Sequence, residues 1–386
     1  MKKFIFITLI IILGLSSKIF AIGKSSDLDL RAHFDEIMNN TAYTVDKAVI
    51  ESIEYDNTSE DRPDVPIESD IRYQHLNIKI YTGSHKGEEL TIRHTIEKIL
   101  PGNYIFKVGD KILLRITEDD SGLIDTVKIQ ERVRDIKVVL IVVLFVILML
   151  LIGGLNGFKA LISLGLSIAL IIFIYIPLII SGHHPILYSV LISASSVILT
   201  FLILSGVSEK TFVSILGTVL GLIFSGILAM GFGYLANLTG LADDNSISLA
   251  YIPQFRNLDY RGILFGTIII GAIGAIMDVA MSISSALWEL REVHSQITKK
   301  EMIKSGMNIG RDIMGSMSNT LILAYVGTTL HLLILFKVYQ IKLIEIINLD
   351  SISTEIIRAM AGSIGLILTI PITVIIATEI YLRNKK

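Results

Sequence analysis

Residues 136–155 read IKVVLIVVLFVILMLLIGGL, and this stretch decides the class of the fold. Lys137 is its single charged residue. At about 1.5 Å per residue, a helix of this length spans about 30 Å, which is the thickness of the hydrocarbon core of a bilayer. The whole chain has 386 residues, of which 52% are hydrophobic, and a mean hydropathy of +0.66. These values are typical of a polytopic α-helical membrane protein.

Further apolar runs of similar length predict that residues 136–386 form a transmembrane helical domain with seven spans. The other six runs are 158–181, 184–206, 211–238, 261–288, 311–337 and 359–382. Residues 1–21, MKKFIFITLIIILGLSSKIFA, place two lysines before a short apolar core. This pattern is typical of a secretory signal peptide and equally of a signal anchor, which would add an eighth helix.

Residues 22–135 hold most of the acidic and polar residues, and they predict a small extracytoplasmic all-β domain. β-rich runs occur at 47–55, 75–83, 88–97, 111–117 and 125–133. Turn sequences such as SHKG, PGN and VGD separate them. Five short strands in about 110 residues favour an antiparallel barrel of OB-like or SH3-like shape. We expect this domain to act as a spacer or as a partner-docking module.

Positively charged residues predict the orientation of the spans. With the N-terminus inside, the inner ends of the spans carry Lys159, Lys210, Arg291, Lys299, Lys300, Lys304, Arg311, Arg383, Lys385 and Lys386, besides Lys2 and Lys3. The outer ends carry fewer, namely Arg134, Lys137, Arg256, Arg261, Lys337, Lys342 and Arg358. We therefore expect the β domain outside and the C-terminus inside a bacterial cytoplasmic (inner) membrane.

Several functional classes are excluded or disfavoured by the sequence. No cysteine occurs, so disulfides and thiolate metal sites are excluded. Walker, Rossmann and HExxH patterns are absent, which argues against an ATP-driven pump and a zinc protease. The net charge of -2 gives no indication of nucleic-acid binding. We expect a protein that is not an enzyme and that has no resident cofactor and no nucleic-acid partner.

The fifth span contains an aspartate in GAIGAIMDVAMSISS (271–285). An ionisable side chain at the centre of a bilayer costs roughly 2.5 to 3.5 kcal/mol, so Asp278 is expected to face protein or water. At about 100° per residue, one line down this helix is polar or small. Its members are Thr267, Gly271, Gly274, Asp278, Met281, Ser282, Ser285 and Glu289.

The sixth span carries a second polar face, with Asp312, Gly315, Ser316 and Asn319 on one side. Centring the two spans places Asn319 at the depth of Asp278. Elsewhere, small residues at four-residue spacing, such as Gly217 and Gly221, predict a tightly packed bundle. Glu355 and Arg358 begin the last span at helical spacing and are interpreted as a surface or interface pair.

These residues predict a polar site between the fifth and sixth spans. Its candidate substrate-binding residues are Asp278, Asn319, Ser282, Met281, Ser285, Asp312 and Ser316. Oxygen ligands with one soft sulfur suit a first-row divalent ion such as Mn²⁺, for which the candidate ligands are Asp278, Asn319 and Met281. The same residues also fit a proton-relay carboxylate beside an organic substrate, or a hydrogen bond that only fixes helix packing.

Long stretches of the chain resemble a known family. They are RGILFGTIIIGAIGAIMDVAMSISSAL (261–287), SGMNIGRDIMGSMSNTLILAYVG (305–327) and TEIIRAMAGSIGLILTIPIT (354–373), with GEEL and VGDKILLRI in the β domain. These blocks resemble the YibE/F-like family of membrane proteins. The resemblance implies a multi-pass bacterial inner-membrane protein suspected of transport, with export of divalent metal such as manganese proposed for some members.

The sequence thus favours a secondary transporter or exporter of a small solute, with a divalent cation as the first candidate. One alternative is a non-transporting membrane subunit that recruits a partner through its β domain, and another is a transporter of an organic solute. An intramembrane enzyme is disfavoured because no serine has a lysine or histidine partner at membrane depth. Expected partners are the lipid bilayer, the small ion or solute, and a second copy or a companion membrane protein.

Overall fold

The structure of the chain, a computed structural model, describes residues 43–58, 71–97, 104–119 and 122–383. The segment predicted as a signal peptide or anchor lies outside the described residues. The chain divides into two compact units, a β domain and a helical domain, with the division between Leu148 and Met149. Each unit is described on its own.

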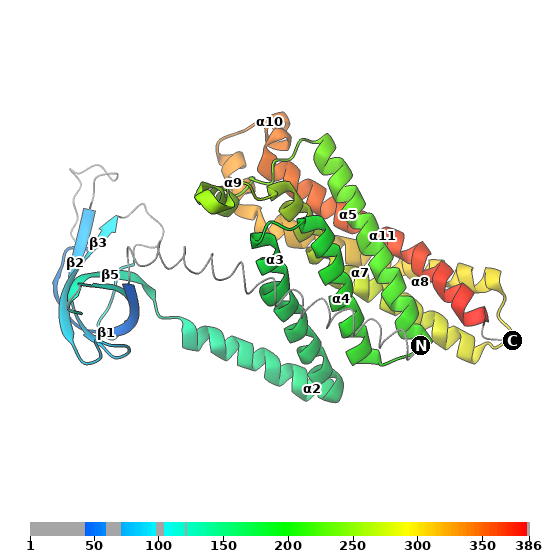
Figure 1. The fold of residues 1–386 in the computed structure, drawn as a ribbon, viewed down its shortest axis with the longest axis horizontal. Helices are drawn as coiled ribbons and strands as arrows, with labels where there is room; N and C mark the ends of the chain where they lie inside the picture. The colour runs from blue at the N-terminus through cyan, green and yellow to red at the C-terminus, as the bar shows by residue number, and fades with distance from the viewer. Residues whose placement is uncertain (1–42, 59–70, 98–103, 120–121, 384–386) are drawn as a thin grey trace. The chain divides into compact units, whose positions relative to one another are not determined.

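The β domain is a half-barrel made of one five-stranded antiparallel sheet (Figure 1). Its strands are β1 (Tyr43–Asp56), β2 (Ile71–Ile80), β3 (Glu89–Glu97), β4 (Lys111–Glu118) and β5 (Ile124–Arg132). The strand order is β3-β2-β1-β4-β5, and the edge strands β3 and β5 approach each other. Each of the five predicted strands is confirmed, and a partly open five-stranded barrel is the arrangement found in OB-folds.

Alternation of side chains along the strands builds the core of this domain. Core residues from β1, β2 and β4, together with Phe106, are at most 1% exposed. They are Ala48, Ile50, Leu76, Ile78, Ile80, Ile112, Leu114 and Ile116. Register shifts in β1 between Ile50 and Ser52 and between Ile53 and Tyr55 mark bulges, which bend the strand. A period-two pattern with a bent central strand therefore accounts for the half-barrel.

The remainder of the described chain is helical. Its α-helices are α2 (Asp135–Leu170), α3 (Ile176–Ile180), α4 (Pro185–Ser205), α5 (Glu209–Leu235), α6 (Asp244–Tyr251), α7 (Tyr260–Val293), α8 (Lys299–Thr328), α9 (Leu330–Val338), α10 (Leu343–Asn348) and α11 (Asp350–Arg383). A π-helix, η2 (Ile171–Tyr175), joins α2 to α3, and a 3-10 turn, η3 (Pro253–Phe255), precedes α7.

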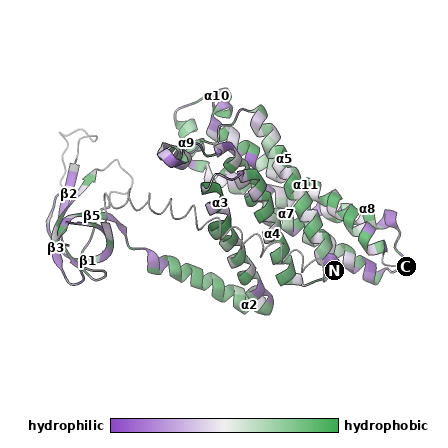
Figure 2. Cartoon of the chain, in the orientation of Figure 1, coloured by the Kyte–Doolittle hydropathy of each residue, from purple (hydrophilic) through white to green (hydrophobic). Residues whose placement is uncertain are grey.

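Five of these helical segments are long and apolar enough to cross a membrane. They are Asp135–Ile180, α4, α5, α7 and α11, and α8 with α9 makes a sixth if that bent pair is counted as one span. In Figure 2, α2 is hydrophobic along most of its length. The chain is therefore a helical membrane protein with five to six apolar helices among its described residues.

The first segment, Asp135–Ile180, contains both of the first two predicted spans, 136–155 and 158–181. It has 46 residues, which at about 1.5 Å each make about 69 Å of helix, roughly twice the thickness of the hydrocarbon core. Gly154 interrupts it with φ 53° and ψ -131°, a conformation that glycine adopts without a steric penalty. This break falls at the junction of the two predicted ranges.

The predicted span 311–337 differs from the helices that the structure forms there. A capping box of Thr298 and Glu301 starts α8 at Lys299, twelve residues earlier than predicted. The helix then ends at Thr328, and α9 continues at an angle of 59°. The apolar run therefore crosses a bend that its composition does not reveal.

Helices α5, α7 and α11 pack against one another in the centre of the helical domain, and α4 and α8 flank them (Figure 1). Small residues let α5 and α11 approach closely, as the four-residue spacing predicts. A Cβ added to Gly221 would lie 1.9 Å from Thr369 Oγ1, and one added to Gly217 would lie 2.2 Å from Thr373 Oγ1. This closed seam holds the centre of the bundle together.

Candidate functional site

Helix α7 has one buried side and one open side. The buried side carries Ile269, Ile276, Val279, Ile283 and Leu287, each fully buried against α5 and α11. The open side is the polar line predicted from the sequence. Thr267, Gly271, Gly274, Asp278, Ser282 and Glu289 are exposed on it, and Met281 and Ser285 are half-buried. The polar line is therefore present in the structure, and the described elements leave most of it, including Asp278, exposed.

Asp278 lies in the middle of this open side. It is 18 residues after the start of α7 at Tyr260 and 15 residues before its end at Val293. Among the described residues it has no hydrogen-bond partner and no ion-pair partner. A carboxylate in this position either faces water or a polar solute, or is covered by another polypeptide.

Helix α8 presents a second open polar side. Asp312, Gly315, Ser316 and Asn319 are all exposed. The Ser316 hydroxyl donates to the Ile313 carbonyl at 3.1 Å, while Asp312 and Arg311 make no ion pair within the described part of the chain. Together, the open sides of α7 and α8 are called the open face below.

The register of the two helices follows from their contacts near the turn that joins them. A Cβ on Gly306 would lie 3.0 Å from Leu287 Cδ1, so these two residues are level. Counting away from the turn in both helices places Asp278 level with about residue 315. Asn319 then lies about 6 Å further from the turn, and Asp312 about 4 to 5 Å nearer to it. Asp278 is thus level with Gly315 and Ser316 rather than with Asn319.

Met281 differs from the other predicted ligands, because its thioether turns toward the core. Its sulfur accepts a hydrogen bond from the Ser214 hydroxyl of α5 at 3.5 Å. The oxygen groups of Asp278, Ser282 and Ser316 remain on the open face. The structure therefore brings carboxylate, hydroxyl and amide oxygens to this face and leaves the sulfur on a different contact.

The open face offers few acidic ligands at any one place. Within the described ranges, no three histidine, aspartate or glutamate side chains gather as a metal-ligand set. Carboxylate, hydroxyl and amide oxygens suit hard cations that keep part of their water shell. The open face therefore presents mainly neutral oxygen groups around the Asp278 carboxylate.

A further polar group, which the sequence predicted as a surface or interface pair, lies near one end of the open face. Arg358 Nη1 donates to Glu355 Oε1 at 2.7 Å, and both side chains are only about a quarter exposed. Glu355 Oε2 and Arg358 Nε are buried without a hydrogen-bond partner in the described structure. Tyr325 lies close enough to both charges to be influenced by them.

Tyr325 connects this pair to the open face, because a Cβ on Gly271 would lie 3.0 Å from Tyr325 Oη. The charge of Arg358 also acts on Asp243, which caps α6. Burial acts to raise the pKa of Asp243, but hydrogen bonds from Ser246 and Asn245 and the charge of Arg358 hold that pKa below its ordinary value. The sequence signal for this group was the helical spacing of Glu355 and Arg358 at the start of the last span.

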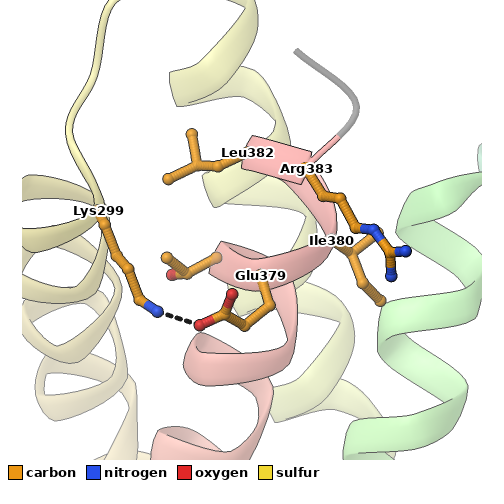
Figure 3. Close-up of a pocket in the computed structure, with 6 residues that line it drawn as sticks. Lys299, Glu379, Ile380, Leu382 and Arg383 are labelled. Atoms are coloured by element: carbon orange, nitrogen blue, oxygen red, sulfur yellow. Dashed lines mark hydrogen bonds and ion pairs between the residues drawn. The ribbon is translucent and has the colours of Figure 1, made fainter. Parts of the chain in front are cut away.

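A hollow of about 440 Å³ lies at the opposite end of α8 and is lined by Lys299, Thr378, Glu379, Ile380, Leu382 and Arg383. Figure 3 shows the Lys299 ammonium directed at the Glu379 carboxylate, with Arg383 extending to the other side of α11. Both members of the ion pair are about 60% exposed, so the pair adds little stability. This hollow contains none of the predicted site residues.

A buried histidine in the β domain connects two of its elements. His85 donates from Nδ1 to Glu88 Oε1 at 3.0 Å and from Nε2 to Glu118 Oε1 at 3.1 Å. Donation from both ring nitrogens requires the imidazolium form. The hydrogen bond to Glu88, followed by that to Glu118, raises the pKa of His85 above its ordinary value, although desolvation opposes them. This arrangement fastens the β2–β3 loop to β4.

The half-barrel, the apolar helices and the open face define a polytopic membrane protein with an N-terminal β domain. The helical part matches the YibE/F-like protein family over residues 141–383, and the β domain matches the YibE/F family N-terminal domain over residues 41–132. The chain belongs to the YibE/F-like protein family, as the sequence blocks predict. No curated protein and no solved structure matched the chain in the comparisons.

Proposed function

We propose that this protein is a secondary transporter that exports a small solute, with a divalent metal cation such as manganese as the first candidate. The observation that carries the proposal is Asp278, a carboxylate halfway along an apolar helix, on the polar side of that helix and without a partner among the residues that the structure describes. Membrane carboxylates in such positions commonly serve ion pathways and proton relays.

Each residue of the open face has a role in this proposal. Asp278 is the central ligand or the proton-coupled carboxylate. Ser282, Ser316 and Asn319 supply neutral oxygens above and below it, and Asp312 attracts cations at the entrance nearer the α7–α8 turn. Ser285 extends the hydroxyl line toward that turn. Met281 would become a ligand only after releasing Ser214.

The proposed topology has seven spans in a bacterial cytoplasmic (inner) membrane, with the β domain outside and the C-terminus inside. The break at Gly154 supports counting Asp135–Ile180 as two spans joined by a tight reversal. The positive residues near the α7–α8 turn, Lys299, Lys300 and Lys304, support an inner location for that turn.

Labelling tests this topology cleanly, because the chain has no native cysteine. Lys107→Cys in the β domain should react with a membrane-impermeant thiol reagent in intact cells, and Arg383→Cys should react only after the cells are opened. Equal labelling of both variants in intact cells would refute the proposed orientation.

Transport itself is tested with the purified protein in liposomes. Uptake of Mn²⁺, Mg²⁺, Ca²⁺, Zn²⁺ and Co²⁺ is measured with and without a pH gradient. We expect selective flux of one ion that falls at least ten-fold in Asp278→Asn. Asp125→Asn, which alters an exposed carboxylate of β5, is the matched control and should retain full flux.

Unchanged flux in Asp278→Asn would refute the central role of this carboxylate. Absence of flux for every ion would favour an organic solute, or the non-transporting subunit that recruits a partner through the β domain. Recovery of a specific protein by the β domain, together with an inert liposome assay, would establish the latter function.

A further inference from the structure

We propose that the open face of α7 and α8 packs against the same face of a second copy of this chain, so that residues of both copies complete the polar site. The inference rests on the proposed function only in naming this site a transport path. The packing itself is argued from the exposure, shape and charge of the open face.

The first observation is the cost of leaving this face to lipid. Asp278 would cost roughly 2.5 to 3.5 kcal/mol at the centre of a bilayer, and the Asn319 amide would add an unsatisfied polar group. The described residues of one copy do not cover them. A covering protein surface removes this cost by supplying hydrogen-bond partners or by enclosing water.

The second observation is the shape of the face. Gly274 and Gly315 have open space where a Cβ would stand, with no heavy atom within 4 Å. In the interior of the same bundle, by contrast, Gly217 and Gly221 are filled by threonine hydroxyls. Small residues at an open surface permit the backbone of another helix to approach closely.

The third observation is the charge of the face, which identifies the occupant. Asp278, Arg311 and Asp312 are exposed, and none has an ion-pair partner in the part of the chain that the structure describes. Arg311 and Asp312 are level with about residue 281 of α7, so all three charges lie within about 6 Å of one depth. A two-fold axis along the membrane normal keeps equal depths opposite each other. Arg311 of each copy then meets an aspartate of the other, which yields two equivalent ion pairs.

Disulfide trapping tests this arrangement, since a single introduced cysteine cannot form a disulfide within one copy, and a product of twice the mass of the chain that contains only this protein joins two copies. Gly315→Cys, Gly274→Cys, Ser316→Cys and Asn319→Cys are oxidised in native membranes. We expect one or more to give a cross-linked dimer in more than half of the protein. Ile227→Cys, on an exposed apolar position of α5, is the control and should give less than a tenth.

Size-exclusion chromatography of each reduced variant first establishes that it is folded. Folded variants that form no cross-link at any of the four positions, together with a single copy per lipid nanodisc by native mass spectrometry, would overturn the proposal. The transport hypothesis is judged separately by the flux of Asp278→Asn. A cross-linked dimer whose flux ignores Asp278 would support the interface and refute the transport path.

Discussion

The seam between α5 and α11 and the open face of α7 and α8 both contain glycines and hydroxyl residues. The seam is tightly packed, whereas the open face is exposed. At the seam, Gly217, Gly221 and Gly365 are filled by side chains from the facing helix. On the open face, Gly274 and Gly315 meet nothing within 4 Å. The seam contains hydroxyls but no charge, whereas Asp278 and Asp312 on the open face have no ion-pair partner within the described ranges.

This difference indicates what each region does. The Thr369 hydroxyl at the seam donates to the Gly365 carbonyl of its own helix at 2.8 Å, which satisfies it without a second helix or solvent. An ionised carboxylate cannot donate to a carbonyl of its own helix, and it therefore requires water, a solute or another polypeptide as its partner. The spacing of small residues predicts close approach of helices in both regions. Only the presence of charged residues distinguishes the candidate site from a packed helix contact.

The largest expected effect comes from forcing the closed seam apart. Gly221→Leu should lower the free energy of unfolding by about 3 kcal/mol or more, because its Cβ would overlap Thr369 Oγ1 and no void can accept the side chain. Thermal unfolding followed by the fluorescence of Trp288, the single tryptophan, measures the change. Gly231→Leu on the same helix points into open space and is the control, with an expected change within about 0.5 kcal/mol.

Equal unfolding temperatures for Gly221→Leu and Gly231→Leu would contradict the tight packing of the seam, because Gly221 would then tolerate a large side chain as well as an exposed position of α5 does. A lower unfolding temperature for Gly221→Leu, and a smaller decrease for Gly221→Ala, would support the tight packing further, since a single methyl group already meets the Thr369 hydroxyl.

A smaller effect is expected at His85, where charge is satisfied within the β domain rather than left open as at Asp278. Its raised pKa means that its stabilising contribution is fully present below about pH 6.5 and is lost as the pH rises through the folded-state pKa. At pH 6, His85→Gln should therefore weaken the β2–β3 loop by about 1 kcal/mol. At pH 9 the wild type and the variant should be nearly equal.

Amide hydrogen exchange of residues 81–88 in the full-length protein measures this effect. Exchange at pH 6 should be about five-fold faster in His85→Gln than in wild type, with a ratio within two-fold at pH 9. The same ratio at both pH values would show that His85 acts through packing and not through its charge.

The smallest effect is expected at the exposed ion pair of Lys299 and Glu379. Lys299→Ala should change the free energy of unfolding by less than about 0.5 kcal/mol, because solvent screens a pair that is about 60% exposed. The fluorescence of Trp288 again provides the measurement. A loss above 2 kcal/mol would mean that this hollow is covered in the membrane and that the pair is buried there.

Local pattern predicted much of this fold. Alternating residues such as Ile78 and Ile80 predicted the strands, and the polar line through Asp278 predicted the open side of α7. The break at Gly154 falls where the sequence separated the spans 136–155 and 158–181. The bend after Thr328 was missed, because it occurs inside an apolar run where composition carries no signal. The register of α7 and α8 depends on the turn and on Gly306 contacting Leu287, which spacing within a single helix cannot supply.

The polar sides of α7 and α8 were predicted from the sequence, but their surroundings were not. Sequence periodicity placed Ser282 and Asp278 on one side of α7, yet it could not say that α5 and α11 cover the other side only. Glu355 and Arg358 were interpreted as a surface or interface pair because their spacing fits one. Tertiary packing leaves Glu355 Oε2 and Arg358 Nε buried near Tyr325, which agrees with the interface alternative.

The central claim is that the open face holds water and polar solute at membrane depth, and cysteine accessibility tests it most directly. Ser282→Cys, in inside-out membrane vesicles, is exposed to a charged, membrane-impermeant thiol reagent that reacts only with a hydrated thiolate. If the open face is hydrated, Ser282→Cys reacts, Mn²⁺ slows its reaction, and Ile227→Cys, at an exposed apolar position of α5, stays unmodified. Ser282→Cys as unreactive as Ile227→Cys would contradict the account.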